Sequence, residues 1–235
     1  MKNHLTCQVR FDGYMISRGK FHSFTMTEIK PGRRRAPKFE LIGGNVALDF
    51  INTLDDRPSV KPKELLKNFY ELARFGEDTG ILTGAELDYF YENAHNEPDE
   101  AGDAVRRAIH LREAMFAVFA ALMKRQVVPQ TAINTLNVYI RDATQHSQLV
   151  QKDGHCELRY NDMTSRYSAM LWPIARAAAD LLTSSDMALL RACSSSTCQW
   201  LFLDTSKNRH RRWCSMKLCG NRAKVRKFYA KVKTA

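Results

Sequence analysis

The chain has 235 residues, and its 36 lysines and arginines against 25 acids give a formal net charge of +11. This length allows one or two domains with a proper hydrophobic core. The sequence holds no run of eighteen apolar residues and no apolar signal-peptide core, so we expect no transmembrane helix and no membrane partner. We therefore expect a cytoplasmic protein, in which thiols stay reduced.

The positive charge is concentrated at the C-terminal end. From Arg191 to Ala235 there are twelve lysines and arginines and one acid, Asp204, whereas Ala36 to Leu190 holds 16 basic and 22 acidic residues. An acidic body joined to a basic segment is typical of a sensor domain linked to a module that binds a polyanion. The same charge balance in the body also fits an ordinary solvated surface.

Residues 1–38 are basic and show no hydrophobic period, which predicts a flexible N-terminal extension. Phe39 to Ile42 resembles a short strand. Cys156 to Tyr160 alternates as a second strand would, and we expect the two to pair in a small β patch.

A helix is predicted after Gly43-Gly44, with Asn45 as its cap. Apolar residues recur at i, i+3, i+4 and i+7 from Ala47 to Leu54, and Asp49 and Asn52 share the opposite side. These two polar residues either cap and tie neighbouring backbone or line a ligand pocket.

The middle of the chain predicts a mainly α domain over residues 39–186. Residues 96–102 and 146–154 read as polar loops, and residues 187–192 as an extended lead into the last segment. We expect five helices here. The first begins at Pro62, the second at Thr83 with a capping-box pattern, and the fourth at Pro129. The third runs from about Asp103 to Arg125, and the fifth from Asp162 or Thr164 to Leu182 with a kink at Pro173.

Arg112 falls inside the apolar stripe of the longest predicted helix. A guanidinium that faces a core must meet a carboxylate or another anion, because burying it unpaired is costly. It either pairs with a carboxylate such as Asp49 or Asp55, or holds an acidic ligand. Asp49, Asn52 and Arg112 are therefore the candidate ligand-binding residues, and the ligand would be a small anion.

Four cysteines stand near the C-terminus as two equally spaced pairs, Cys193/Cys198 and Cys214/Cys219. Two short loops that each offer two thiolates can complete the tetrahedron of one structural zinc ion. Disulfides and four unrelated thiols are the other interpretations, and His210 could replace one thiolate.

The sequence from Cys198 to Tyr229 resembles the CGNR zinc finger, named for the residues that stand here from Cys219 to Arg222. In that family the finger follows a helical domain called ABATE, described as a stress-induced transcription regulator. The opening motif of that domain is similar to the segment from Leu41 to Leu54. The resemblance covers Phe39 to about Lys233 and implies a zinc-binding regulator that binds DNA.

Within residues 187–235 we expect a zinc finger with a C-terminal basic helix. Trp200 to Leu203 predicts a strand, Asp204 to Ser206 a turn and a possible helix cap, and Gly220 a tight bend over the metal. The basic side chains can lie along a phosphate backbone. The candidate nucleic-acid-binding residues are Lys207, Arg209, Arg211, Arg212, Arg222, Lys224, Lys227 and Lys231.

These observations predict a transcription regulator in which a helical ligand- or stress-sensing domain precedes a DNA-binding finger. Duplex DNA is the expected partner, and a homodimer is compatible with the sequence. An RNA- or ribosome-binding zinc protein is the alternative. A small-molecule enzyme ranks lower, because the sequence has no P-loop, G-x-S-x-G or H-E-x-x-H motif and four protein ligands would saturate the zinc.

Overall fold

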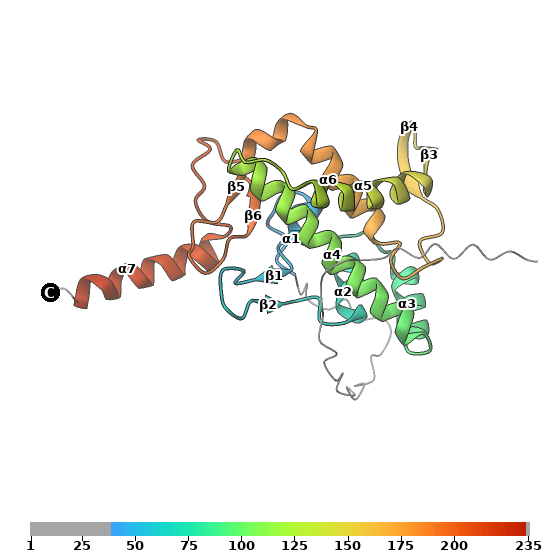
Figure 1. Ribbon diagram of the computed structural model, residues 1–235, viewed down its shortest axis with the longest axis horizontal. Coiled ribbons are helices and arrows are strands. Elements are labelled where there is room, and N and C mark those ends of the chain that lie inside the picture. Colours follow the sequence, from blue (N-terminus) through green and yellow to red (C-terminus); the bar gives the residue numbers. More distant parts are fainter. Residues whose placement is uncertain (1–38, 234–235) are drawn as a thin grey trace, which may run out of the picture. The chain divides into compact units, whose positions relative to one another are not determined.

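The computed structural model describes residues 39–233, and the predicted basic extension over residues 1–38 lies outside this range. The described chain is mainly helical, as predicted (Figure 1). Its α-helices are α1 Val46–Ile51, α2 Phe69–Asp78, α3 Gly84–Asn93, α4 Pro98–Met123, α5 Gln130–Gln145, α6 Leu171–Leu182 and α7 Asn221–Lys233. None of the helices described is long and apolar enough to cross a bilayer.

Within residues 39–233 the strands form three separate antiparallel pairs. The strand pairs are β1 Leu54–Asp55 with β2 Lys63–Glu64, β3 Ser147–Lys152 with β4 His155–Tyr160, and β5 Leu190–Ala192 with β6 Leu201–Leu203. Two shorter helical turns complete the described fold, a 3-10 turn at Ser185–Leu189 and a π turn at Met216–Gly220.

The short helix α1 lies at the centre of the core. It packs against α4, α6 and β6, and Ala47, Leu48 and Phe50 are fully buried. The long helix α4 packs against α5 and α6 and also against α2 (Figure 1). Helices α4 and α6 and the strand β6 therefore surround α1.

Two glycines precede α1, and the local geometry explains both. A Cβ on Gly43 would lie 2.9 Å from the Cβ of Leu48 and 3.0 Å from the backbone nitrogen of Asp49, so no larger residue fits. Gly44 has φ +76°, which favours glycine. Asn45 then accepts a hydrogen bond from the Ala47 N–H at 2.9 Å, which confirms the predicted cap.

Several predicted boundaries are wrong. Residues 39–42 form no strand, and β4 pairs instead with β3, which occupies the region predicted as a polar turn. The helix expected at Pro62 begins at Phe69, because residues 63–64 pair with β1 and Asn68 provides the cap. The first helix likewise ends at Ile51 and not at Leu54.

Proline accounts for two further differences. Helix α4 begins at Pro98, inside the predicted acidic loop, because proline suits the first helical position, where no N–H is needed. Helix α6 begins at Leu171, so Pro173 lies in its first turn, where no intrahelical bond is lost, and no kink is required.

The predicted capping box from Thr83 to Glu86 is confirmed. The lead into the last segment is a 3-10 turn followed by β5, not one extended stretch.

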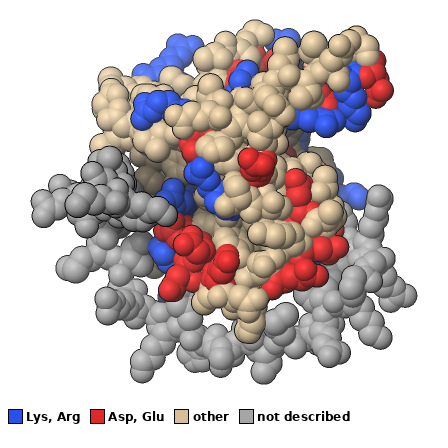
Figure 2. All heavy atoms as spheres, turned by 90° about the vertical axis from the view of Figure 1, so that its right-hand side faces the viewer, with Lys and Arg blue, Asp and Glu red and all other residues tan. Residues whose placement is uncertain are grey.

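Acidic side chains gather on one face of the helical body. Figure 2 shows this cluster in the view toward the end of the body that carries α3 and the β3–β4 pair. Exposed acids on α3 and at the start of α4 are Asp88, Glu92, Glu97, Asp99 and Glu100. The acidic and basic parts of the sequence are thus carried by different elements of the fold.

Candidate metal centre and nucleic-acid interface

The four predicted cysteines come together in one buried cluster. Their sulfur atoms all lie within 4.8 Å of one another, with Cys198 Sγ 3.7 Å and Cys219 Sγ 3.5 Å from Cys214 Sγ. Zinc–sulfur bonds of about 2.3 Å in a tetrahedron place the sulfurs about 3.8 Å apart. The donor set therefore fits a single structural zinc ion. His210 is exposed and does not belong to this cluster of described residues.

The crowding of the four thiols affects them unequally. Hydrogen bonds from the Cys198 and Cys214 thiols lower the pKa of Cys193, whereas hydrogen bonds with Cys193 and Cys214 raise the pKa of Cys198, and the hydrogen bond with Cys193 raises that of Cys214. Without metal, the protons of Cys198 and Cys214 are therefore held within the cluster. A zinc ion would replace those protons, because the thiolate is the form that binds metal.

Backbone hydrogen bonds shape the loop that carries the first cysteine pair. The Cys193 N–H donates to the Trp200 carbonyl at 2.8 Å, and the Cys198 N–H donates to the Ser195 carbonyl at 3.2 Å. Gln199 follows in the left-handed region, with φ 61°. The chain can therefore turn sharply and enter β6 directly behind the metal site.

The second cysteine pair spans the π turn. The sequence predicted that Gly220 would allow a tight bend, and in the structure this glycine is closely approached by two side chains. A Cβ on Gly220 would lie 2.7 Å from the Met216 sulfur and 3.4 Å from Trp213 Cδ1. Its backbone is not among the positive-φ glycines described. The absence of a side chain lets Met216 and Trp213 pack over the metal loop.

Two arginines on one side of α7 face the metal loops. Arg222 Nη2 donates to Cys219 Sγ at 3.1 Å, and Arg226 donates to the hydroxyls of Ser195 and Ser196 at 3.2 and 3.1 Å. Burial acts to lower the pKa of Arg222, but the hydrogen bond and charge of Cys219, together with the charges of Cys198 and Asp55, outweigh burial and raise it. The start of α7 is thereby tied to both cysteine loops.

A basic loop follows β6 and is held by the one acid of the segment. The Asp204 carboxylate is buried and accepts hydrogen bonds from the backbone N–H groups of Ser206 at 3.1 Å and Arg211 at 2.8 Å. The hydrogen bond from the Ser206 hydroxyl keeps the pKa of Asp204 low. Asp204 therefore closes a loop over residues 204–211, and no helix begins within this loop, so the helix cap expected here is not formed.

Of the eight predicted nucleic-acid-binding residues, all except Arg211 fall into two groups. Five have exposed side chains, Lys207, Arg209 and Arg212 on or next to the basic loop and Arg222 and Lys224 on α7. Lys227 and Lys231 also lie on α7, but their side chains are outside the described set. The exposed cations flank the metal centre, and their role in nucleic-acid binding stays a prediction.

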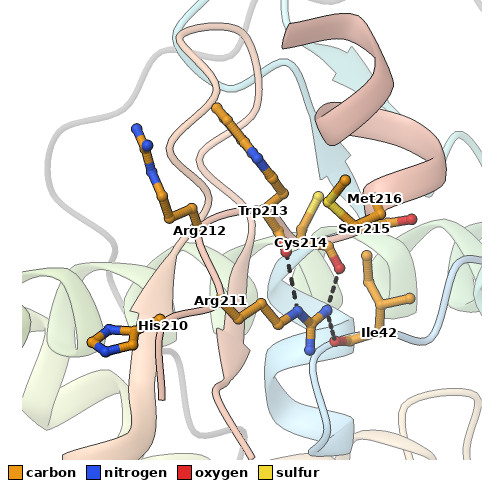
Figure 3. A pocket seen from close by; sticks show the side chains of 8 residues that line it. All are labelled: Ile42, His210, Arg211, Arg212, Trp213, Cys214, Ser215 and Met216. Atoms are coloured by element: carbon orange, nitrogen blue, oxygen red, sulfur yellow. Dashed lines mark hydrogen bonds between the residues drawn. The ribbon is translucent and has the colours of Figure 1, made fainter. Parts of the chain in front are cut away.

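Arg211 differs from the rest because its side chain turns inward. Its Nε donates to the Trp213 carbonyl at 3.0 Å, and its Nη2 donates to the carbonyls of Cys214 and Ile42 (Figure 3). The guanidinium lies 4.3 Å from the ring centroid of Phe202. Arg211 thus joins the metal loop to the segment that precedes α1.

The strand β6 belongs to two cores at once. Leu201 and Leu203 are buried with the core of the helical body, whereas Phe202 is buried with the cysteine cluster and Trp200. Successive residues of a strand point to opposite faces, so one three-residue strand serves both sides. This explains why the run from Trp200 to Leu203 is apolar without alternation.

Two contacts from the segment around α1 hold β6 in place. The Asn52 side chain donates from Nδ2 to the Leu201 carbonyl at 2.9 Å and accepts from the Leu201 N–H at 2.8 Å. The Leu203 N–H donates to the Gly43 carbonyl at 2.8 Å. Asn52 is 3% exposed, so these bonds are shielded from water. The body therefore binds the backbone of the finger.

The Asp49 side chain also accepts a hydrogen bond from the backbone. Its Oδ1 accepts from the Gly43 N–H at 2.7 Å. Burial raises the pKa of Asp49 to about 6, and the hydrogen bonds from Gly43 and Ile42 only partly oppose this shift. Asp49 and Asn52 thus make the backbone ties that were one of the two interpretations, and their ligand-binding role stays a prediction.

Arg112 pairs with a carboxylate, but the partner is not one of those predicted. Its Nη1 and Nη2 each donate to one oxygen of Glu64 at 2.7 Å, and its Nε donates to Glu113 at 2.9 Å. Asp49 and Asp55 do not reach it because the pairing of β1 with β2 brings Glu64 there. Thr53 and Arg57 complete the network by bonding Arg112 and Glu113 respectively. An anionic ligand would have to displace Glu64.

Two family models match the chain. The ABATE model, described as "Putative stress-induced transcription regulator", matches residues 44–185, more than half of the chain. The chain belongs to the ABATE family. The CGNR zinc finger model matches residues 190–232. Neither is an enzyme family, and a search of curated proteins gives no match. With the sulfur geometry, these matches identify the four cysteines as the site of one zinc ion.

The ABATE and CGNR parts of this chain meet at residues that sequence reasoning did not connect. The bond from Asn52 to Leu201 joins positions 149 residues apart, and nothing in the local pattern of either segment predicts it. The contacts of Arg222 and Arg226 were likewise missed, because a basic helix after a cysteine pair looks like a solvated or nucleic-acid-binding face. The polar side of the otherwise apolar segment around α1 was the one sequence feature that could have indicated the contact with β6.

Proposed function

We propose that this ABATE-family chain regulates transcription by binding duplex DNA through its zinc finger. The observation that carries the proposal is the distribution of charge. The segment from Arg191 to Ala235 holds twelve basic residues and one acid. That acid, Asp204, is buried and bonded, so exposed cations around the metal centre have no acidic residue of their own segment in solvent. A phosphate backbone supplies the missing negative charge.

The family description supports the regulatory part of the proposal. The helical body would sense a small anion or a stress signal in the reducing cytoplasm, and the finger would respond through β6. Any signal that shifts α1 is passed to the backbone of Leu201 by Asn52. The contacts of Asp49, Asn52 and Arg112 are then what a ligand would have to rearrange.

An anisotropy titration of labelled duplex DNA with zinc-loaded protein, at two salt concentrations, tests this proposal. Each phosphate neutralised by a lysine or arginine adds about 0.9 to the slope of log affinity against log salt. We expect tight binding with a steep slope. A Cys214→Ser/Cys219→Ser variant should lose it, and Lys124→Gln, which removes an exposed lysine of the body, should not.

The competing nucleic acid is RNA. The same titration with a structured RNA of equal length distinguishes the two, because the electrostatic contribution is shared and only the preference differs. Stronger binding to RNA would replace duplex DNA in the proposal. Absence of salt-sensitive binding to either would show that the charge is only a solvated surface.

A further inference from the structure

A hollow of about 560 Å³ opens beside the zinc centre, between the basic loop and the π turn. Figure 3 shows the residues around it. Ile42, Trp213 and Met216 give it apolar surface, Arg211 and Arg212 give it positive charge, and His210 adds a polar ring. The eight described residues that line it include no acid.

The hollow has a fixed floor and an adjustable rim. Arg211 is tied to the carbonyls of Ile42, Trp213 and Cys214, so the floor is set by hydrogen bonds. Arg212 is exposed and lies 5.4 Å from the ring centroid of Trp213, a loose contact. Figure 3 shows Arg212 and Trp213 projecting together, away from Arg211. A flat group could stack on Trp213 once Arg212 swings aside.

The chemistry of the hollow limits what can enter it. An aromatic surface rimmed by cations suits a group that is both planar and attached to negative charge. An apolar side chain of a protein partner could contact Trp213 but would gain nothing from the charge of Arg212. Resting on the proposed function, we infer that this hollow receives one unstacked nucleobase, with its indole platform at Trp213 and the neighbouring phosphate at Arg212.

This inference has a consequence for substrate choice. A base in a regular duplex is stacked on both sides and is not free to lie on Trp213. Removing a base from the stack costs a few kcal/mol and costs least where it is unpaired. The chain should therefore bind a duplex with one unpaired base more tightly than a fully paired duplex of the same length.

Titration of both duplexes with wild type, Trp213→Leu and Lys207→Gln tests the inference. Base–aromatic stacking is worth about 1–3 kcal/mol, so Trp213→Leu should weaken binding to the duplex with the unpaired base roughly 5- to 150-fold with an unchanged salt slope. Lys207→Gln, which removes an exposed charge outside the hollow, should weaken binding to both duplexes alike and reduce the slope.

Trp213→Phe provides a readout that does not depend on a weakened fold. Its fluorescence, subtracted from that of wild type, isolates the indole of Trp213, and we expect the unpaired base to quench that difference signal. If Trp213→Leu binds both duplexes as wild type does and the signal is unquenched, the hollow takes no base although the finger still binds nucleic acid. If wild type binds neither duplex, the proposed function fails as well.

Discussion

At the scale of single residues, Asp49 links the fold to pH. Burial raises its pKa from the ordinary 3.8 to about 6. The folded chain therefore holds a proton more tightly than the unfolded chain. The resulting stabilisation is fully present below about pH 4 and is lost as the pH rises through about 6.

Asp49→Asn should remove this dependence, because the amide oxygen can still accept from Gly43 and cannot ionise. Relative to wild type, the variant should gain up to about 3 kcal/mol of unfolding free energy between about pH 4 and about pH 7.5. Urea unfolding of both proteins at the two pH values measures this. A difference that stays constant with pH would contradict the assignment.

Arg222 makes a second residue-scale prediction. It donates to the Cys219 sulfur, and partners of metal ligands typically change metal affinity by about 10- to 100-fold. Arg222→Met should therefore speed zinc release to a chelator. Lys224→Met, two residues along the same helix and exposed, is the matched control. Equal release from both variants would mean that Arg222 acts only as a surface charge.

What the sequence predicted at this scale depended on distance along the chain. The zinc cysteines could be identified, because two short loops with paired thiols are a local pattern. Arg112 could be predicted to need a carboxylate, since burial requires one. Its partner Glu64 could not, because it arrives through the pairing of β1 with β2. Gly220 was assigned to a bend because its neighbours in space were unknown.

At the scale of elements, the bond between α1 and β6 is the feature to test. Asn52→Ala would leave the N–H and carbonyl of Leu201 unsatisfied in a buried place. Each unsatisfied group costs about 1–3 kcal/mol, so we expect about 2–6 kcal/mol of lost stability from the two groups. Chemical denaturation measures the total. Hydrogen exchange at Leu201 should also become faster.

The N-cap of α2 provides the control for that experiment. Asn68→Ala removes a cap hydrogen bond to Glu71 and should cost about 1 kcal/mol without touching β6. Its effect on exchange at Leu201 should be no larger than the global loss of stability explains. If Asn52→Ala behaves like this control, the bond does not hold the finger to the body.

Helix starts were predicted well where a cap was strong, and also at Pro129, which directly precedes α5 without a side-chain cap. Thr83 with Glu86 and Asn45 after two glycines were correct, since both caps are local. Pro62 failed because proline also suits the approach to a strand, and Asn68 with Glu71 gave the true start. The hairpin β3–β4 was missed because its first strand is polar and half exposed. Domain boundaries drawn from these elements stay predictions.

At the scale of the whole molecule, zinc should stabilise more than the finger. Because β6 is packed on one side by the cysteine cluster and on the other by the helical core, removal of the metal loosens both. We expect a chelator to lower the melting temperature of the helical signal in circular dichroism, and zinc to restore it. A helical transition that ignores the chelator would show that the two cores are independent.

The mainly α architecture and the family could be recognised from the sequence, and the matches of residues 44–185 and 190–232 confirm the recognition. The dependence of one part on the other could not. Sequence periodicity reports which residues are buried, but not against what. The strand expected from Trp200 to Leu203 was assigned to the finger, but its residues Leu201 and Leu203 are buried in the helical core.

The shared strand also sets a rule for anyone who cuts or recombines this chain. Classical zinc modules can be excised and moved between hosts because each buries its own apolar residues. Here, excision at the boundary near residue 187 would expose Leu190, Leu201 and Leu203 to solvent. It would also expose the apolar residues of the helical body that these leucines cover. Chimaeras that exchange fingers between such proteins should therefore carry the α1 segment along with the finger, as one transplantable unit.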